Sequence, residues 1–548
     1  KVMAGSQIIP VRGLGSVGVI RDVDPYDLPP SAWSKAKNVV FQNGAAHRGP
    51  AFRTVASSLG AAAPVFMMGI YQLTGYDQFL YANSDGSLYI RTGGVDTDVS
   101  EAGHVDTVNT NYQTTGCILG EVVYVNSPGM IPRYKRPGDA DFLLLSAAGW
   151  DADWKAKALR PFGDYLVALN ITKDADEFPT TVKWSDIALI GQPPASWDAT
   201  SPTTTAGETT LTDLTGPLID GLMLRDAFML YSRSEVVTMR FVGGRFIMDF
   251  RAAFKDAGVI APNCIVEAQG KHFVFGTNDI YTHDGLNKQS LVEGSNRDFI
   301  FRTLDSDAAH LCFAMHNQRA SEVWFCYRSV DGEAKWQGTS HCNMAFVFNY
   351  ASGTGSYVDL PNAVASGIAN AAPVTTWTSL VGTAWQNWGG FWASSATKNV
   401  RYPLMLGAPF AGTPALTGSR IWALDPHSGP RSTLSLPVDT ETVADAILER
   451  LGIDLDEMGA GLSLFKLVRR IYPQVKYSGG SLFVRAGGHK FPGSVATFSS
   501  SKGFDPSTKY KVDIRNGGRY LSLQYLQEGV GDFTITGHDI EVVGIGRK

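Results

Sequence analysis

A strand-rich segment recurs along the first two-thirds of this chain. The copies begin at Tyr76, Gly120, Gly163, Asp226, Gly270 and Ser321. Their spacings are 44, 43, 63, 44 and 51 residues, and each copy holds an alternating apolar strand, a tight turn and a partner strand. A period of this length is typical of β-propeller blades, each of which is one small antiparallel sheet. An array of β-sandwiches with coincidental spacing is the alternative.

The longest interval contains a segment of different composition. Residues 192–210 read QPPASWDATSPTTTAGETT, which is rich in Pro and Thr. Such clusters between periodic segments indicate loops. We therefore expect an inserted loop here, which lengthens one repeat without changing its strands.

The rest of the chain divides by composition. Gly (58) and Pro (27) favour short strands and turns over long helices. We expect a mainly β protein with a β-propeller-like repeat domain, an additional small β-rich domain and insertions. The predicted parts are an extended N-terminal arm with the first strands (1–59), the repeats (60–350), a Trp- and Gly-rich insertion (351–460) and a C-terminal β-rich region (461–548).

The insertion is nearly uncharged and contains four tryptophans that need cover. They are Trp377, Trp385, Trp388 and Trp392. A short helix is predicted over Asp439–Leu451, because Thr442 and Asp445 resemble a capping box and Gly452 suits a helix stop. Farther along, the Gly479–Gly480 pair predicts a hairpin turn.

Charge is distributed unevenly. The net charge is -5, but residues 461–548 contain 13 Lys plus Arg and 6 Asp plus Glu, so they carry +7 and residues 1–460 carry -12. An acidic body is not the footprint of a protein built to grip nucleic acid. The basic end contains Lys466, Arg469, Arg470, Lys476, Arg485 and Lys490 beside Phe465, Tyr472, Tyr477 and Phe483. This pattern can follow a nucleic-acid backbone, but solvated strand faces or contacts with an acidic partner are the commoner explanation.

The absence of certain motifs limits both the cellular compartment and the catalytic activity that we expect for this protein. Five cysteines, no signal-peptide pattern and no apolar run of ~18 residues predict synthesis in a reducing cytosol and no membrane span. Gly13, Gly15 and Gly18 match GxGxxG, but the prolines that follow prevent the helix a dinucleotide needs, so we expect no cofactor. The sequence contains no GxSxG, HExxH or GxxxxGK[ST]. We therefore expect that the protein is not an enzyme.

One segment rich in histidine and cysteine is a candidate zinc site. It contains His310, Cys312, His316, Cys326, His341 and Cys342. If the loop at Gln318–Ala320 joins two antiparallel strands, Cys312 faces Cys326 and His316 faces Glu322. The segment has no CxxC pair or other usual zinc spacing, and cysteine is often simply buried. Buried core residues are the favoured interpretation, and no metal is predicted.

The N-terminal residues VIRDVDPYDLPPSAWSKAKNVVFQNGAAHRGPAF, from Val19, carry a family resemblance. They resemble the opening of tail proteins of short-tailed bacteriophages, the nozzle and packaged-DNA stabilisation (tail hub) group. The matching positions are Leu28, Pro29 and Pro30, then Asn38, Val39, Phe41, Asn43 and Gly44, then Arg48, which Gly49 follows without the usual intervening residue. Similar segments follow in the family's order: VKWSD from Val182, DIYTHDG from Asp279 and VDIRNGGRYLSLQY from Val512.

The resemblance implies a structural virion protein of the phage tail, made in the host cytoplasm. Such subunits form a ring, here expected to be a homohexamer, that retains packaged DNA and conducts it during ejection. The implied partners are the tail adaptor, tail fibre or spike proteins, a host surface, and double-stranded DNA that passes through the lumen without sequence specificity. A receptor- or glycan-binding propeller, with or without glycoside hydrolase activity, is the alternative.

Two segments are expected to contact other subunits. The arm Ser6–Pro30 should be extended and lie against a neighbour rather than its own core, since its prolines exclude helix. The candidate inter-subunit residues are Leu28, Pro29, Pro30, Trp33, Trp377, Trp385, Trp388 and Trp392.

Overall fold

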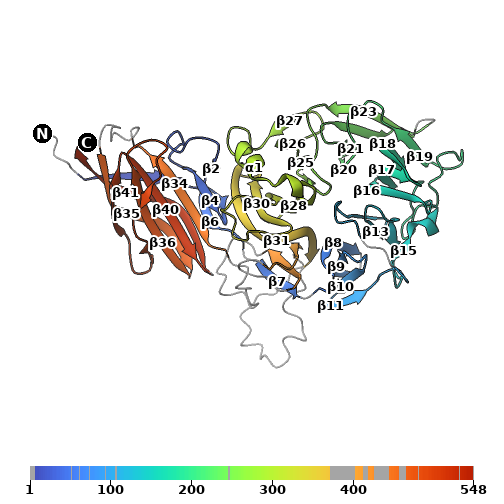
Figure 1. Cartoon of the computed structure of the whole chain (residues 1–548), viewed down its shortest axis with the longest axis horizontal. Coiled ribbons are helices and arrows are strands. Elements are labelled where there is room, and N and C mark those ends of the chain that lie inside the picture. The colour runs from blue at the N-terminus through green and yellow to red at the C-terminus, as the bar shows by residue number, and fades with distance from the viewer. Residues whose placement is uncertain are drawn as a thin grey trace, which may run out of the picture.

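The structure is a computed structural model of the 548-residue chain. It describes residues 6–546 except 51, 58, 61, 73–74, 93, 105–107, 245–246, 371–400, 412–417, 425–443, 456–464, 479 and 530. Two β bodies lie side by side, a ring of small sheets and a sandwich that holds both ends of the described chain (Figure 1).

Five of the small sheets follow one another along the chain, each with four antiparallel strands in sequence order. We call them blades 1 to 5. Blade 1 holds β8 (Pro64–Gln72), β9 (Gly75–Asn83), β10 (Leu88–Thr92) and β11 (Val95–Asp98); blade 2 holds β12 (Thr115–Leu119), β13 (Val122–Asn126), β14 (Arg133–Lys135) and β15 (Leu143–Leu144). Blade 3 holds β16 (Trp154–Phe162), β17 (Tyr165–Lys173), β18 (Asp176–Trp184) and β19 (Gly207–Thr210); blade 4 holds β20 (Asp220–Leu224), β21 (Ala227–Tyr231), β22 (Val236–Phe241) and β23 (Met248–Phe254). Blade 5 holds β24 (Ile265–Ala268), β25 (Lys271–Phe275), β26 (Ile280–His283) and β27 (Lys288–Ser290).

Two further blades share one long strand. Blade 6 consists of β28 (Phe313–Asn317), β29 (Glu322–Tyr327), β30 (Cys342–Asn349) and the first half of β31 (Thr354–Asn370). The second half of β31 begins blade 7, which continues through β32 (Arg401–Gly407), β33 (Arg420–Leu424) and β7 (Phe52–Ser57). Strand β7 precedes all the other blade strands in sequence. By pairing with β33, it joins the beginning of the propeller's sequence to its end and closes the ring.

The inner strands of consecutive blades contact one another around the ring, and β31 returns against β8. This last approach requires glycine: a Cβ at Gly69 would lie 1.7 Å from the carbonyl oxygen of Ile368. The fold is therefore a β-propeller domain, as the period predicted, with seven blades among the described residues. The six recurring segments are the second strands β9, β13, β17, β21, β25 and β29. Residues 192–206 of the Pro- and Thr-rich segment lie in the connection between β18 and β19, as expected, whereas its last four residues form β19.

The second body is a sandwich of two sheets. One contains β39 (Val512–Gly518), β35 (Phe465–Ser478), β41 (Asp532–Gly546), β6 (Ala45–Arg48) and β5 (Val39–Gln42), with β1 (Gln7–Arg12) beside β41. The other contains β4 (Lys35–Lys37), β34 (Ala446–Ile453), β40 (Tyr520–Glu528), β36 (Ser481–His489) and β37 (Thr497–Phe498). Their facing side chains, such as Ile471 and Ile535 against Leu448 and Leu523, belong to one buried core. The predicted additional β-rich domain is thus present, but it takes strands from both ends of the chain.

The expected N-terminal arm is part of this core. Strand β1 pairs along its length with β41, and Ile9, Val11 and Leu14 are buried. The expectation that Ser6–Pro30 avoids its own core is wrong, because the alternation of β1 offers an apolar face to the open edge of β41. The glycines of GLGSVG connect β1 to β2 (Gly18–Val19), and Gly15 packs on the backbone of Ala45.

Three expectations for the C-terminal half are also corrected. Residues 446–451 of the helix predicted over Asp439–Leu451 are instead part of β34 (Ala446–Ile453), whose strict in–out burial has the period of a strand. The rest of that helix up to residue 443 lies outside the described residues. The segment 351–460 is no separate insertion where it is described, since β31 to β33 complete the propeller. Strands β35 and β36 flank the Gly479–Gly480 pair but belong to opposite sheets, so they form no hairpin.

One continuous sheet joins the two bodies. The outer strand of blade 6, β31, pairs with β4 at Tyr357 and Lys37, and β4 pairs with β34 of the sandwich. At this junction the buried Asp359 carboxylate lies 3.0 Å from Lys37 Nζ and accepts a hydrogen bond from Asn38 Nδ2 at 2.7 Å. Asn38 Nδ2 also donates to the carbonyl of Asp445 at 2.8 Å, so this cluster ties the propeller to the sandwich.

We predict that Asp359→Ala lowers the free energy of unfolding by about 3–5 kcal/mol, because Lys37 is left buried without its counter-charge. Chemical denaturation monitored by fluorescence measures the change. The control is Asp249→Ala, which breaks an ion pair whose Arg251 side chain is 79% exposed and should change stability by less than about 0.5 kcal/mol. Equal effects of the two substitutions would contradict the role given to Asp359.

Candidate functional site

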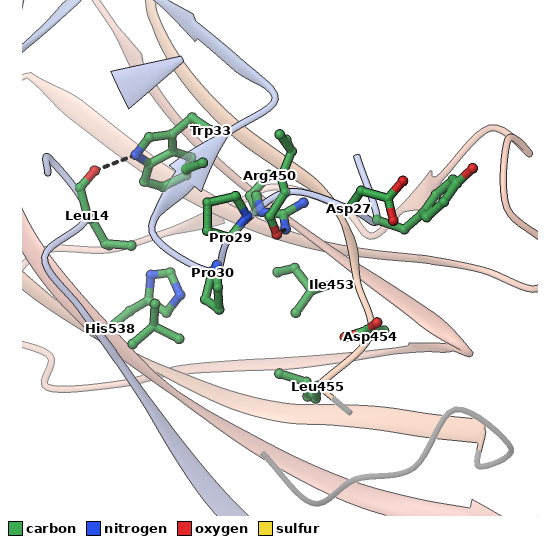
Figure 2. Close-up of a pocket in the computed structure, with 14 residues that line it drawn as sticks. Leu14, Asp27, Pro29, Pro30, Trp33, Arg450, Ile453, Asp454, Leu455 and His538 are labelled. Carbon is green, nitrogen blue, oxygen red and sulfur yellow. Dashed lines mark hydrogen bonds between the residues drawn. The ribbon is translucent and has the colours of Figure 1, made fainter. Parts of the chain in front are cut away.

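A cavity of about 450 Å³ opens in the sandwich beneath the Leu28–Pro30 segment (Figure 2). Its walls come from the N-terminal segment, the end of β34 and β41. Most lining residues are apolar, and the polar ones include Arg450, His538, Asp27 and Asp454. The accessible lining is about equally polar and apolar, so the cavity is more polar than a typical small-molecule site.

Arg450 fixes the roof of this cavity. Its Nη1 donates to the carbonyls of Pro25 and Leu451, and its Nη2 donates to the carbonyl of Leu28 at 2.6 Å. All three acceptors are neutral main-chain oxygens, and burial lowers the pKa of the guanidinium to about 10. Arg450 is thus a clamp that holds the chain before Pro29 in place.

His538 and Trp33 form the opposite part of the cavity. Trp33 is buried and donates its indole N–H to the carbonyl of Leu14 at 2.6 Å (Figure 2). Burial lowers the pKa of His538 to about 4, so this imidazole is neutral near pH 7. The ring stacks on Tyr525, with centroids 5.9 Å apart. The cavity lining therefore includes one buried cation already bonded to three carbonyls, one neutral imidazole and the side chains of Asp27 and Asp454.

The residues predicted to contact other subunits divide into three groups. Leu28 and Trp33 are buried inside the chain itself, so they are not surface residues, whereas Pro29 and Pro30 are exposed at the cavity. The four tryptophans Trp377, Trp385, Trp388 and Trp392 lie outside the described residues. The mixture arises because the LPP segment crosses over the sandwich and turns only some side chains inward.

The centre of the propeller holds a polar network. Arg160 on β16 makes two hydrogen bonds to the Asp220 carboxylate on β20, at 2.7 and 2.8 Å. The same guanidinium donates to Asn263 Oδ1 at 2.8 Å, and Asn263 Nδ2 donates to Gln113 Oε1 at 2.8 Å. Gln113 in turn donates to the carbonyl of His310 at 2.9 Å, next to blade 6. These bonds link blades on opposite sides of the ring.

This network occupies the propeller's own channel. The cavity that remains there is about 220 Å³ and includes Arg160, Asp220 and Asn263 in its lining. Every one of these groups is committed to a partner inside the protein, so the network works as a lock between blades. Sequence reasoning missed these residues, since no motif joins positions that lie 103 residues apart.

A second buried network connects blades 4 and 5. His283 Nδ1 accepts from the Gly285 N–H at 3.1 Å, so its Nε2 carries the proton and donates to Tyr231 Oη at 2.6 Å. The Tyr231 hydroxyl then donates to His272 Nδ1 at 2.7 Å, and His272 Nε2 donates to the Met223 carbonyl at 3.0 Å. This one-directional chain is complete only when both imidazoles are neutral. Burial lowers the pKa of His272 to about 4 and that of His283 to about 3.

In the candidate zinc segment, the register of the strand pairing differs from the predicted one. Cys326 pairs with Phe313 rather than Cys312, and His316 pairs with Val323, because the turn consists of residues 318–321, one residue more than predicted. The shift by one residue turns side chains to the other face. Burial raises the pKa of Cys312 and Cys326, which keeps both thiols protonated. Among the described residues, no three His, Cys, Asp or Glu side chains are grouped as metal ligands.

The basic C-terminal residues do not form one surface. Arg470 pairs with Asp513 at 3.0 Å and Glu541 at 3.2 Å, and Tyr472 donates to the same Glu541 at 3.2 Å. Lys466 is buried and donates to the carbonyls of Asp454 and Arg519. These contacts favour the interpretation as strand faces over that of a nucleic-acid track. No helix in the described part of the chain has the length and apolar character to span a bilayer.

Comparison with known proteins finds matches among solved structures but none among family models or curated proteins. No family model and no curated protein matches the chain. Among solved structures, the WD40 β-propeller domain of Doa1 is similar at a TM-score of 0.36 and 8% identity, covering 70% of this chain and 98% of that one. The computationally designed Ika8 protein is similar at a TM-score of 0.34 and 8% identity, covering 68% of this chain and 99% of that one.

We predict that Arg450→Met frees the segment it clamps, because three main-chain carbonyls, including the buried carbonyl of Leu28, lose their donor. Limited trypsin digestion should cleave after Arg21 several times faster than in the parent protein. Arg251→Met, which removes an arginine that is 79% exposed, is the control and should leave that cleavage unchanged. An unchanged digestion pattern in Arg450→Met would show that the segment is held by other contacts.

We also predict that stability falls as pH drops from about 6.5 toward 4. Histidines whose folded pKa lies below the unfolded value of ~6.5 stabilise the fold above that pH and lose this contribution on acidification. The His272 and His283 shifts correspond to a loss on the order of 2 kcal/mol each at pH 5. Thermal denaturation from pH 7 to 5 should show a shallower pH slope for His272→Gln than for the parent. A His272→Gln slope equal to that of the parent would contradict this account.

Proposed function

We propose that this chain is a structural subunit of a short-tailed phage tail, in a nozzle or hub ring that retains packaged DNA and conducts it during ejection. The observation that carries the proposal is the rigid joint between propeller and sandwich, a continuous sheet with a buried ion pair at its centre. The family-like residues Asn38, Val39 and Phe41 lie at this joint. A wall that confines DNA under pressure needs such stiffness between its parts.

The filled propeller channel supports a particular placement of the DNA. Arg160, Asp220 and Asn263 bond to one another at the centre of the single propeller, and the cavity left there, about 220 Å³, has no room for a DNA duplex. DNA would therefore pass between subunits, through the middle of the ring. A wall that carries more Asp and Glu than Lys and Arg suits sliding, because each neutralised phosphate adds affinity through counterion release. The charge of -12 over residues 1–460 is consistent with that requirement.

The proposed partners follow from this placement. A tail adaptor would contact one face of the ring, and fibre or spike proteins and the host surface would contact others. The subunit contact itself should be heterologous, repeated about a closed axis, and bury more than ~1,000 Å². In this proposal the protein acts in the virion tail after synthesis in the host cytoplasm.

We predict that the purified full-length protein assembles into closed rings, with six subunits expected. Mass photometry at micromolar concentration and negative-stain electron microscopy measure the subunit number and show whether a central hole exists. A protein that stays monomeric both in solution and in its native particle would overturn the proposal. Specific binding of a glycan by that monomer would instead establish the receptor-binding alternative.

A further inference from the structure

Three consecutive blades present exposed apolar side chains from the same kind of loop. The loop between the third and fourth strands carries Leu189 and Ile190 in blade 3, which are 69% and 80% exposed. The corresponding loops carry Phe241 and Val242 in blade 4, both 55% exposed, and Leu286 in blade 5, 81% exposed. We call these five residues the apolar arc.

The arc lies on one face of the propeller, because each loop contacts the turn between the first and second strands of the preceding blade. In blade 3, the Gly191 N–H donates to the carbonyl of Gly120 at 2.7 Å. In blade 4, the Phe241 ring stacks on Tyr165 with centroids 6.0 Å apart. In blade 5, a Cβ at Gly285 would lie 3.6 Å from Leu224. The contact is repeated from blade to blade, so the arc follows the rim of a single face.

The loops that carry the arc are held in place by their own hydrogen bonds. Ala188 N–H donates to the Asp164 carbonyl at 2.8 Å, and the Asp186 carboxylate accepts from the Thr205 N–H and hydroxyl at 3.0 and 2.6 Å. In blade 5, the Asp284 carboxylate accepts from the Leu286 and Asn287 N–H groups at 2.9 and 2.7 Å. Apolar side chains on pre-organised loops lose little entropy on binding, which favours a role as interface anchors.

The equivalent loop of blade 2 is different. There Arg136 pairs with Asp139 at 3.0 Å, and the connection presents charged groups instead of apolar ones. Among blades 2 to 5, the apolar loops are therefore those of blades 3, 4 and 5. A cluster of exposed apolar side chains on one side of a molecule is costly in water and marks a contact surface.

The sandwich offers a surface of matching character. Its loop after β36 carries Phe491 and Val495, which are 65% and 92% exposed, next to the exposed Lys490. A turn closed by the Ser494 N–H and the Phe491 carbonyl at 3.2 Å shapes this loop. The charged residue of this loop is Lys490, whereas Asp164, Asp186 and Asp284 lie in or next to the loops of the arc. Apolar anchors and opposite charge make the two surfaces complementary.

We propose that the apolar arc of one copy binds the Lys490–Val495 loop of a second copy. Two different patches of the same chain then meet, and such a heterologous contact can repeat around a closed axis. This inference rests on the proposed ring and identifies which surfaces would form it.

Substitution at each surface tests the contact. We expect Ile190→Asp with Leu286→Asp, and separately Phe491→Asp with Val495→Asp, to weaken association at least tenfold in mass photometry. Val330→Asp, at a 61% exposed position in blade 6 on the loop between the second and third strands, is the control and should assemble like the parent. Circular dichroism melting should be unchanged for all variants, because every substituted side chain is exposed.

Cross-linking tests the pairing directly. All five native cysteines are buried, so an added surface thiol is the reactive one. A mixture of Ile190→Cys and Val495→Cys proteins should yield a cross-linked pair with a short bifunctional thiol reagent. Efficient cross-linking of Ile190→Cys protein with itself would indicate a two-fold contact and overturn the inference. A parent that forms rings insensitive to both double variants would overturn this inference alone, whereas a monomeric parent would overturn the proposed ring as well.

Discussion

The buried Asp359 carboxylate decides how the two halves of this molecule are joined. It lies on β31, the strand that ends blade 6 and begins blade 7, and it holds Lys37 and Asn38 from the N-terminal segment. Its Oδ1, the oxygen next to Lys37, also accepts the Lys335 N–H at 2.9 Å. Because the main-chain N–H of Asp359 also donates to Asn38 Oδ1 at 2.8 Å, strand, loop and N-terminal segment meet in one set of bonds. A buried charge with this many partners allows only one arrangement of the three segments around it, since any shift would leave an ion without its partner.

The remaining architecture depends on this fixed junction. The N-terminal segment runs from β1 in the sandwich, through β4 at the junction, to β7 in blade 7. It therefore belongs to both bodies, and neither closes without it. Inside the propeller the Arg160 network ties blades across the axis, and the Tyr231 network joins neighbouring blades. Polar groups in both networks are satisfied within the protein, which favours stiffness over exchange with a ligand.

Only part of the candidate sites could be predicted from the sequence. The LPP segment was singled out by its residues, but Arg450, which clamps it, is 422 residues from Leu28. Nothing in a single sequence signals which distant arginine will meet a given carbonyl. The predicted pairing of Cys312 with Cys326 is wrong for a related reason. One extra turn residue moves every cross-strand pair by one position, and packing sets the conformation of the turn. The apolar arc has no sequence pattern, because Leu189, Phe241 and Leu286 become neighbours only through the repeated stacking of blades.

The sequence by itself determined the repeating unit. Strand alternation and turn residues act over a few positions, so the second strands β9, β13, β17, β21, β25 and β29 were placed correctly, as was the long loop before β19. Only the tertiary structure decided that β7 closes blade 7, that β34 is a strand, and that β35 and β36 lie in opposite sheets. Those outcomes depend on which sheet edge is open to receive a strand. An open edge belongs to the assembled fold, because its hydrogen-bonding groups come from segments hundreds of residues away.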